Sequence, residues 1–156
     1  MFRRGTGPEA VAVQSVDNSG YTHVGLLVGR YPDWNVLHVE PAQAGYGGKV
    51  EIIPLHKFAS RDHAVTYAVF RVKDAGTEAV TQALNKAQGQ IGTTFDGDYR
   101  YSDDVAVYCT ELVGKAYQAA NIDLTDWSSA VKAPFMEDPI LTPAALLKSG
   151  KLHRIG

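Results

Sequence analysis

The chain has 156 residues, 45% of them hydrophobic and 21% charged, values close to globular averages that exclude a disordered or fibrous protein. This length fits one domain spanning residues 1–156 with a single core. The net charge of -2, with Arg3-Arg4 as the one basic pair, excludes an extended nucleic-acid surface, and a single cysteine excludes a disulfide framework or a cysteine-based zinc module.

The first residues lack the apolar core of a signal peptide, and no apolar run in the sequence reaches the length of a membrane span. We therefore expect a cytoplasmic protein without a transmembrane segment. A processed or truncated N-terminus would instead make it periplasmic or secreted.

The first half of the chain is predicted to be rich in strands. A short helix starts at Pro8 and ends before the turn at residues 17–20. The stretches 22–29 and 34–40 are typical of strands, and the turn between them predicts a hairpin. Further strands are expected at residues 49–53, 64–72 and 151–155, with one helical turn at 54–59.

The second half is predicted to be mainly helical. Helices are expected over residues 77–91, from Cys109 to about Asn121, and over residues 142–150. The fold class is therefore α+β, with four or five mostly antiparallel strands and helices packed on them.

Cys109 stands at the predicted start of a helix, directly after the extended residues 105–108. The unpaired N–H groups and the positive dipole end at such a position favour a thiolate, the form of cysteine that acts as a nucleophile. The alternative is an inert core thiol, because Cys109 shares one helix face with Leu112, Val113 and Ala116, and free cysteines are often buried.

A cysteine nucleophile needs a base and a group that orients this base. His23 starts the first strand of the predicted hairpin and Glu40 ends the second, so strand pairing brings both residues to one end of the hairpin. Glu40 could then accept the imidazole N–H of His23 and leave the other nitrogen for Cys109. Alternatively, His23 is a core histidine and Glu40 a solvated carboxylate.

The same strands permit a metal site. His38 lies two residues before Glu40, so His23, His38 and Glu40 could supply three ligands to a catalytic zinc ion. The sequence lacks a zinc signature such as His-Glu-x-x-His, and we expect neither a metal nor another cofactor. A metal-dependent hydrolase would instead contain zinc when purified and lose its activity to a chelator.

Glu111 complicates the thiolate hypothesis. A carboxylate two residues from Cys109 raises the pKa of the thiol, so Glu111 must point away or be neutralised. Arg100 and the pair Arg3-Arg4 are the candidate partners.

Five segments are informative in combination: Phe2-Arg3-Arg4-Gly5, residues 21–28 (YTHVGLLV), His38-Val39-Glu40-Pro41, residues 108–113 (YCTELV) with Ala116-Tyr117, and Thr142-Pro143. In this order they resemble the YaeF/YiiX group of circularly permuted papain-like amidases of the NlpC superfamily, over nearly the whole chain. Family members usually carry a further strand with a Gly-Asp pair before the Phe-Arg-Arg-Gly segment, often behind a secretion signal, whereas Met1 directly precedes that segment here.

The resemblance implies a permuted papain-like fold with Cys109 as nucleophile, His23 as base and Glu40 as the acid that orients it. It also implies hydrolysis of amide or ester bonds in peptides, cell-wall fragments or lipids. Tyr21 and Tyr108 flank the reacting residues and are expected to line the substrate site, and no nucleic-acid partner is expected. The competing hypothesis is a module of the same fold that binds a peptide or lipid without cleaving it.

Overall fold

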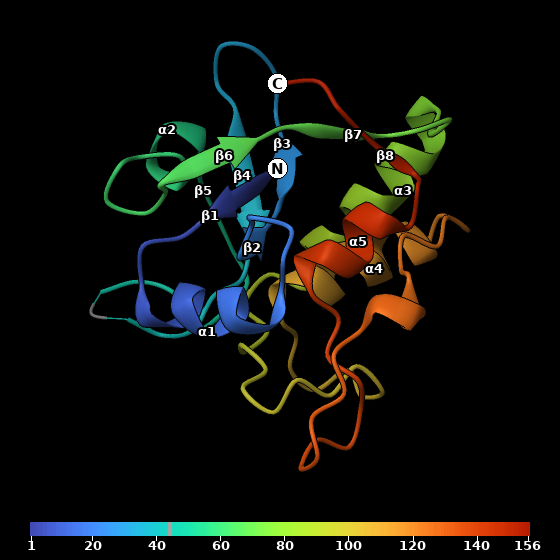
Figure 1. Cartoon of the computed structure of the whole chain (residues 1–156). Coiled ribbons are helices and arrows are strands. Elements are labelled where there is room, and N and C mark those ends of the chain that lie inside the picture. Colours follow the sequence, from blue (N-terminus) through green and yellow to red (C-terminus); the bar gives the residue numbers. More distant parts are fainter. Residues whose placement is uncertain (44) are drawn as a thin grey trace.

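The computed structural model describes residues 1–43 and 45–156, and it confirms the predicted α+β class (Figure 1). In the described residues the strands form three small antiparallel sheets. The first has the order β2 (His23–Val24), β1 (Phe2–Arg4), β6 (Thr66–Ala68); the second has the order β3 (Leu26–Val28), β4 (Asn35–His38), β5 (Glu51–Pro54); and β7 (Phe70–Val72) pairs with β8 (Leu152–Arg154). The helices are α1 (Pro8–Val16), α2 (Leu55–Phe58), α3 (Thr77–Gln88), α4 (Cys109–Gln118) and α5 (Pro143–Lys148), with a 3-10 turn at Trp127–Ser129.

The predicted hairpin is present, because β3 and β4 pair with Leu26 opposite Leu37 and Val28 opposite Asn35. The predicted strand 22–29 is nevertheless divided between two sheets. Gly25 separates β2 from β3, and its N–H donates to the carbonyl of Met1. A single extended run therefore pairs with β1 at its start and with β4 at its end.

The pairing of β1 with β2 sorts side chains onto two faces. Phe2 lies opposite Val24, and both are buried in the main hydrophobic core with residues of α3 and α4. Arg3 lies opposite His23, and because side chains alternate along a strand, both point to the other face. The register thus places a buried cation next to the predicted base.

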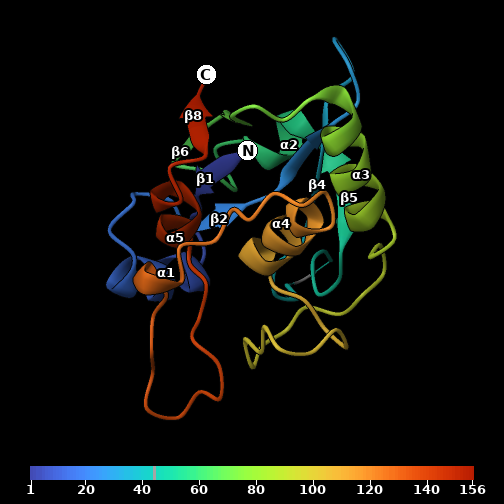
Figure 2. The same ribbon diagram turned by 90° about the vertical axis from the view of Figure 1, so that its right-hand side faces the viewer.

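The helices cover the strands on different sides. α3 and α4 lie side by side (Figure 2), and apolar residues of both belong to the main core. α1 lies beside the end of β2, near the loops that precede α4 (Figure 1). None of the described helices is long and apolar enough to cross a membrane.

Glu111 is fully buried at the start of α4, and the structure identifies its partners. Its Oε2 accepts the backbone N–H of Tyr108 at 3.1 Å, and its Oε1 lies 2.8 Å from Nζ of Lys115, one helical turn further. The expected pairing with Arg100 or Arg3 is therefore wrong: Arg100 pairs with Glu137 at the surface and Arg3 with Glu40. Glu111 caps the helix that carries the thiol and is neutralised from within it.

Candidate active site

Cys109 is the first residue of α4 and only 8% exposed. Its sulfur accepts hydrogen bonds from the backbone N–H groups of Thr110, in the same helical turn, and of Val24, in β2. Because Val24 directly follows His23, the thiol lies against the strand that carries the predicted base. The prediction of a cysteine at the start of a helix is confirmed, whereas residues 105–108 form no strand and contribute only an isolated bridge at Val107.

The protonation state of Cys109 differs from the expectation for a helix start. Burial raises the pKa of the thiol to about 12, and the negative charge of Glu9 raises it further, whereas the hydrogen bonds from Val24 and Thr110 lower it. The helix start therefore acts in the predicted direction, but desolvation outweighs it. Cys109 is therefore a neutral thiol near pH 7.

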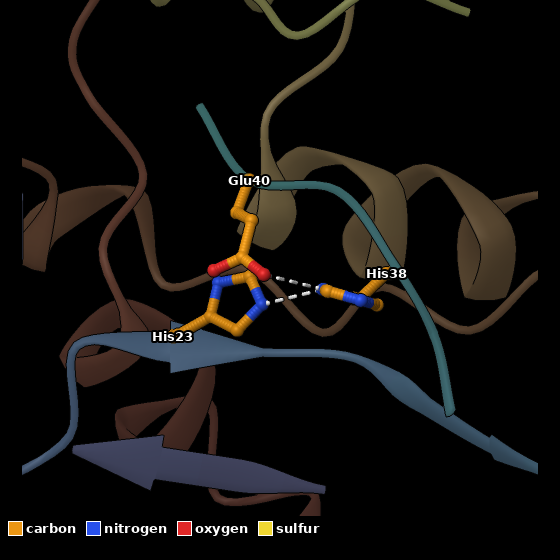
Figure 3. Close-up of side chains that lie close together, drawn as sticks. All are labelled: His23, His38 and Glu40. Atoms are coloured by element: carbon orange, nitrogen blue, oxygen red, sulfur yellow. Dashed lines mark hydrogen bonds and ion pairs between the residues drawn. The ribbon is translucent and has the colours of Figure 1, made fainter. Parts of the chain in front are cut away.

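His23, His38 and Glu40 converge on one point, each of them 95% buried or more (Figure 3). Nε2 of His23 is hydrogen-bonded to Nδ1 of His38 at 3.0 Å, and this Nδ1 lies 3.8 Å from Oε1 of Glu40. His38 is therefore the immediate partner of His23, and Glu40 comes next. From the sequence we expected Glu40 to hold the imidazole directly, with His38 only as a neighbour.

Arg3 is a site residue that the sequence analysis missed. Its Nη2 donates to Oε2 of Glu40 at 2.6 Å, and its Nη1 donates to the carbonyl of Phe58 at 3.0 Å, with the guanidinium 97% buried. Arg3 thereby fixes the carboxylate and leaves Oε1 facing the imidazoles. The signal was present in the Phe-Arg-Arg-Gly segment, but only the strand register shows which arginine points inward.

The ring of Phe58, the last residue of α2, forms the floor of this cluster. The ring centroids of His23 and His38 lie 5.6 and 5.4 Å from that of Phe58, and the guanidinium carbon of Arg3 lies 4.4 Å from it. Phe58 is completely buried. A rigid aromatic surface thus restricts the positions of three polar side chains at once.

Burial also determines the charge of the two imidazoles. It lowers the pKa of His23 well below its ordinary value and that of His38 to about 3, and the cation of Arg3 adds to both effects. Burial raises the pKa of Glu40, which the Arg3 cation opposes. At neutral pH both histidines are therefore neutral, so a ring nitrogen is available to accept a proton.

Two neighbouring clefts hold the candidate base and the candidate nucleophile, one residue in each. A polar cleft of about 100 Å³ is lined by His23 and Glu40, and an apolar cleft of about 210 Å³ is lined by Cys109 and Tyr108. Tyr108 was predicted to line the substrate site, whereas Tyr21 packs against Phe2 and Phe70 in the core. Further residues of the apolar cleft are Val13, Val16, Phe95, Tyr99, Ile140 and Leu141.

Glu9 and Thr22 line both clefts and so form the ridge between them. The sequence analysis assigned Glu9 no role in the site. Burial and the charge of Glu40 raise the pKa of Glu9 to about 7. Glu9 is therefore neutral below this pH and negative above it, close to Cys109 and Glu40.

Replacing Glu9 with glutamine is expected to speed the alkylation of Cys109 by iodoacetamide at alkaline pH. Above about pH 8 the wild-type carboxylate is charged and raises the pKa of the thiol, so its removal should increase the rate roughly two- to fivefold. Below about pH 6 the carboxyl is protonated, and the two rates should agree. The control is Glu78→Gln, at the second residue of α3, which should alkylate at the wild-type rate at every pH. If the ratio of the alkylation rates of Glu9→Gln and the wild type did not change with pH, this role of Glu9 would be contradicted.

His23, His38 and Glu40 are also the potential metal ligands in the described part of the chain. One ligand atom each of His23, His38 and Glu40 lies within 4.8 Å of the others. This matches the ligand set that the sequence permitted, and two imidazoles with one carboxylate form a known zinc-binding combination.

Comparison with known proteins identifies the family of the chain. Residues 8–156 match the family model described as permuted papain-like amidase enzyme, YaeF/YiiX, C92 family. The chain belongs to this family. Membership of the YaeF/YiiX family supports a cysteine hydrolase in general terms, and it confirms the resemblance seen in the sequence.

A solved structure shows the same fold. It is described as the crystal structure of metalloprotein yiiX from Escherichia coli O157:H7, DUF1105, with a TM-score of 0.81 and 21% identity, covering 99% of this chain and 93% of that one. At this identity the likeness establishes the YaeF/YiiX papain-like fold alone. No curated protein is significantly similar to the chain in sequence.

Proposed function

We propose that this chain is a cysteine hydrolase of amide or ester bonds, with Cys109 as nucleophile and His23 as base. The observation that carries the proposal is the position of the thiol: Cys109 begins α4, and its sulfur is hydrogen-bonded to the residue that follows His23. His38 orients the base, and Glu40 acts through His38 while Arg3 holds it. Arg3, His23 and Glu40 line the polar cleft, and Cys109 lines the apolar cleft.

The proposed reaction begins with a neutral thiol and a neutral imidazole. Nε2 of His23 and Nδ1 of His38 share a hydrogen bond. The proposed mechanism uses the tautomer in which His23 carries the proton on Nε2 and donates it to His38, so that Nδ1 of His23 is free to take the proton of Cys109. The sulfur forms a bond to the substrate carbonyl carbon, and the resulting oxyanion is stabilised by backbone N–H groups at the start of α4, by ~3 kcal/mol per donor. His23 then gives its proton to the leaving group, and the C–N or C–O bond breaks.

A thioester on Cys109 remains, and water hydrolyses it with His23 as base once more. The acyl part of the substrate would occupy the apolar cleft, which contains the thiol, and the leaving group would face the polar cleft, which contains the base. We therefore propose a substrate with an apolar or aromatic acyl group. Peptides, cell-wall fragments and lipids remain the candidate classes.

Trapping of the acyl-enzyme tests the proposal. The wild type is mixed with p-nitrophenyl octanoate and p-nitrophenyl acetate, and intact-mass spectrometry is recorded during turnover. We expect one acyl group per chain, no adduct in Cys109→Ala, and a higher kcat/KM for the longer ester. A folded protein that binds octanoate but forms no adduct and releases no p-nitrophenol would instead support the non-catalytic binding module.

A further inference from the structure

Three electron-pair donors converge in the buried cluster of Figure 3. Nε2 of His23 and Nδ1 of His38 are 3.0 Å apart, and Oε1 of Glu40 lies 3.8 Å from the latter atom. One ligand atom of each residue lies within 4.8 Å of the others. Two ligands of one zinc ion, each about 2 Å from it, lie at most about 4 Å apart, so the pair at the longest distance must close slightly when the ion binds. The single proton that now joins the imidazoles occupies the place that a cation would take.

We propose that His23, His38 and Glu40 form an inhibitory Zn²⁺ site, whose occupation removes the base from Cys109. The binding part of this proposal stands on the cluster alone, and the inhibitory part rests on the proposed cysteine hydrolase.

The donor set favours zinc over harder cations. Two imidazoles and one carboxylate suit Zn²⁺, whereas Ca²⁺ and Mg²⁺ require more oxygen ligands. Arg3 occupies Oε2 of Glu40 and so holds the carboxylate with Oε1 toward the imidazoles, the usual arrangement around a ligating carboxylate. The positive charge of Arg3 opposes a second cation, which limits the affinity of the site.

The site borders the polar cleft. His23 and Glu40 both line the polar cleft, while His38 lies behind them with no exposed surface. A cation entering from the cleft therefore meets two ligands first and the third at its deepest point. The fourth position would face the cleft.

Zinc binding and thiol activation require opposite protonation of His23. As the base, His23 keeps its proton on Nε2 and accepts a second one on Nδ1. With Nε2 bound to a cation, the proton of the neutral ring lies on Nδ1, and His23 has no free lone pair for the thiol. One imidazole cannot serve both purposes at the same time.

Isothermal titration with ZnCl₂ after EDTA treatment tests the binding. We expect one zinc ion per chain for the wild type and for the exposed-site control His153→Asn. For His38→Asn, which retains a hydrogen-bond acceptor near the position of Nδ1 but loses the imidazole ligand, affinity should fall about 10- to 100-fold. Glu40→Gln should fall similarly and serves if His38→Asn does not fold.

Cys109→Ala separates this site from binding by the thiol itself. It should bind zinc as the wild type does, because Cys109 contributes no ligand. Loss of binding in Cys109→Ala, the absence of binding in the wild type, or wild-type affinity in both His38→Asn and Glu40→Gln would overturn the proposed site.

Hydrolysis of p-nitrophenyl octanoate then tests the inhibition. Saturating zinc should lower the wild-type rate at least tenfold, and EDTA should restore it. His38→Asn should hydrolyse the ester at the same rate with and without zinc, at the zinc concentration that inhibits the wild type. This comparison holds whatever the rate of His38→Asn without zinc is. Activity that appears only with zinc would overturn the inhibitory role, whereas zinc binding by a protein inactive under both conditions would leave the site intact and refute the proposed hydrolase.

Discussion

Replacing His23 with alanine is expected to lower kcat/KM for ester hydrolysis by about 10²–10⁴-fold, the usual contribution of a positioned general base. The effect should be this large because burial leaves Cys109 with a raised pKa, so almost no thiolate forms without a base. His38→Ala should cost less, roughly 10- to 100-fold, since His38 acts only by orienting His23. Steady-state kinetics at saturating and limiting ester concentrations measure both effects.

The matched control is His153→Ala, at an exposed position of β8 far along the chain from the site. It should leave the rate unchanged, and circular dichroism should show that all three variants are folded. If His23→Ala retained the activity of His153→Ala, Cys109 would not depend on His23, and the proposed function would be wrong. His23→Ala and His38→Ala could instead lower kcat/KM equally, while His38→Asn restores it. That result would mean that positioning of His23 by His38 contributes as much to the rate as His23 does as the base.

Replacing Gly25 with alanine is expected to destabilise the fold by about 2–3 kcal/mol and to inactivate the site. A Cβ at Gly25 would lie 2.6 Å from Cγ1 of Val36, 2.8 Å from the carbonyl oxygen of Leu37 and 2.9 Å from Cβ of His38. Atoms of the β4 backbone cannot move aside without breaking its pairing with β3 and β5. Relief of the clash should therefore shift His38 away from His23.

Gly97→Ala provides the control, because a Cβ at Gly97 meets no atom within 4 Å. The free energy of unfolding of both variants can be measured by urea denaturation, with ester hydrolysis as the functional readout. We expect Gly97→Ala to remain within about 0.5 kcal/mol of the wild type. Equal stability of the two variants would mean that β2 and β4 do not approach as closely as described.

The local elements of this protein follow from its sequence. The change from extended residues to helical spacing at Cys109 predicts a thiol at the start of α4, and the turn expected between the stretches 22–29 and 34–40 lies between β3 and β4. These predictions succeed because period, proline and glycine act on neighbouring residues. The candidate nucleophile, base and acid were found in the same way, as residues at the ends of such elements.

Contacts between distant residues required the tertiary structure. Arg3 and Glu40 are 37 positions apart, and only the register of β1 against β2 shows that Arg3 faces the site. The same holds for His38 as the direct partner of His23, for Glu9 on the ridge between the clefts, and for Lys115 as the partner of Glu111. Strand pairing, not sequence spacing, determines which polar side chains meet.

The sequence alone determined the type of fold, the position of the thiol and the three residues of the proposed reaction. The tertiary structure decided their electrostatic state, since the pKa of Cys109 depends on how much water the surrounding elements exclude, and local sequence contains no such measure. It also determined that residues 22–29 are divided between two sheets, since the division occurs at Gly25, where β4 packs closely against the backbone. Desolvation and close packing are properties of the assembled chain, whereas periodicity and turn chemistry are already present in its sequence.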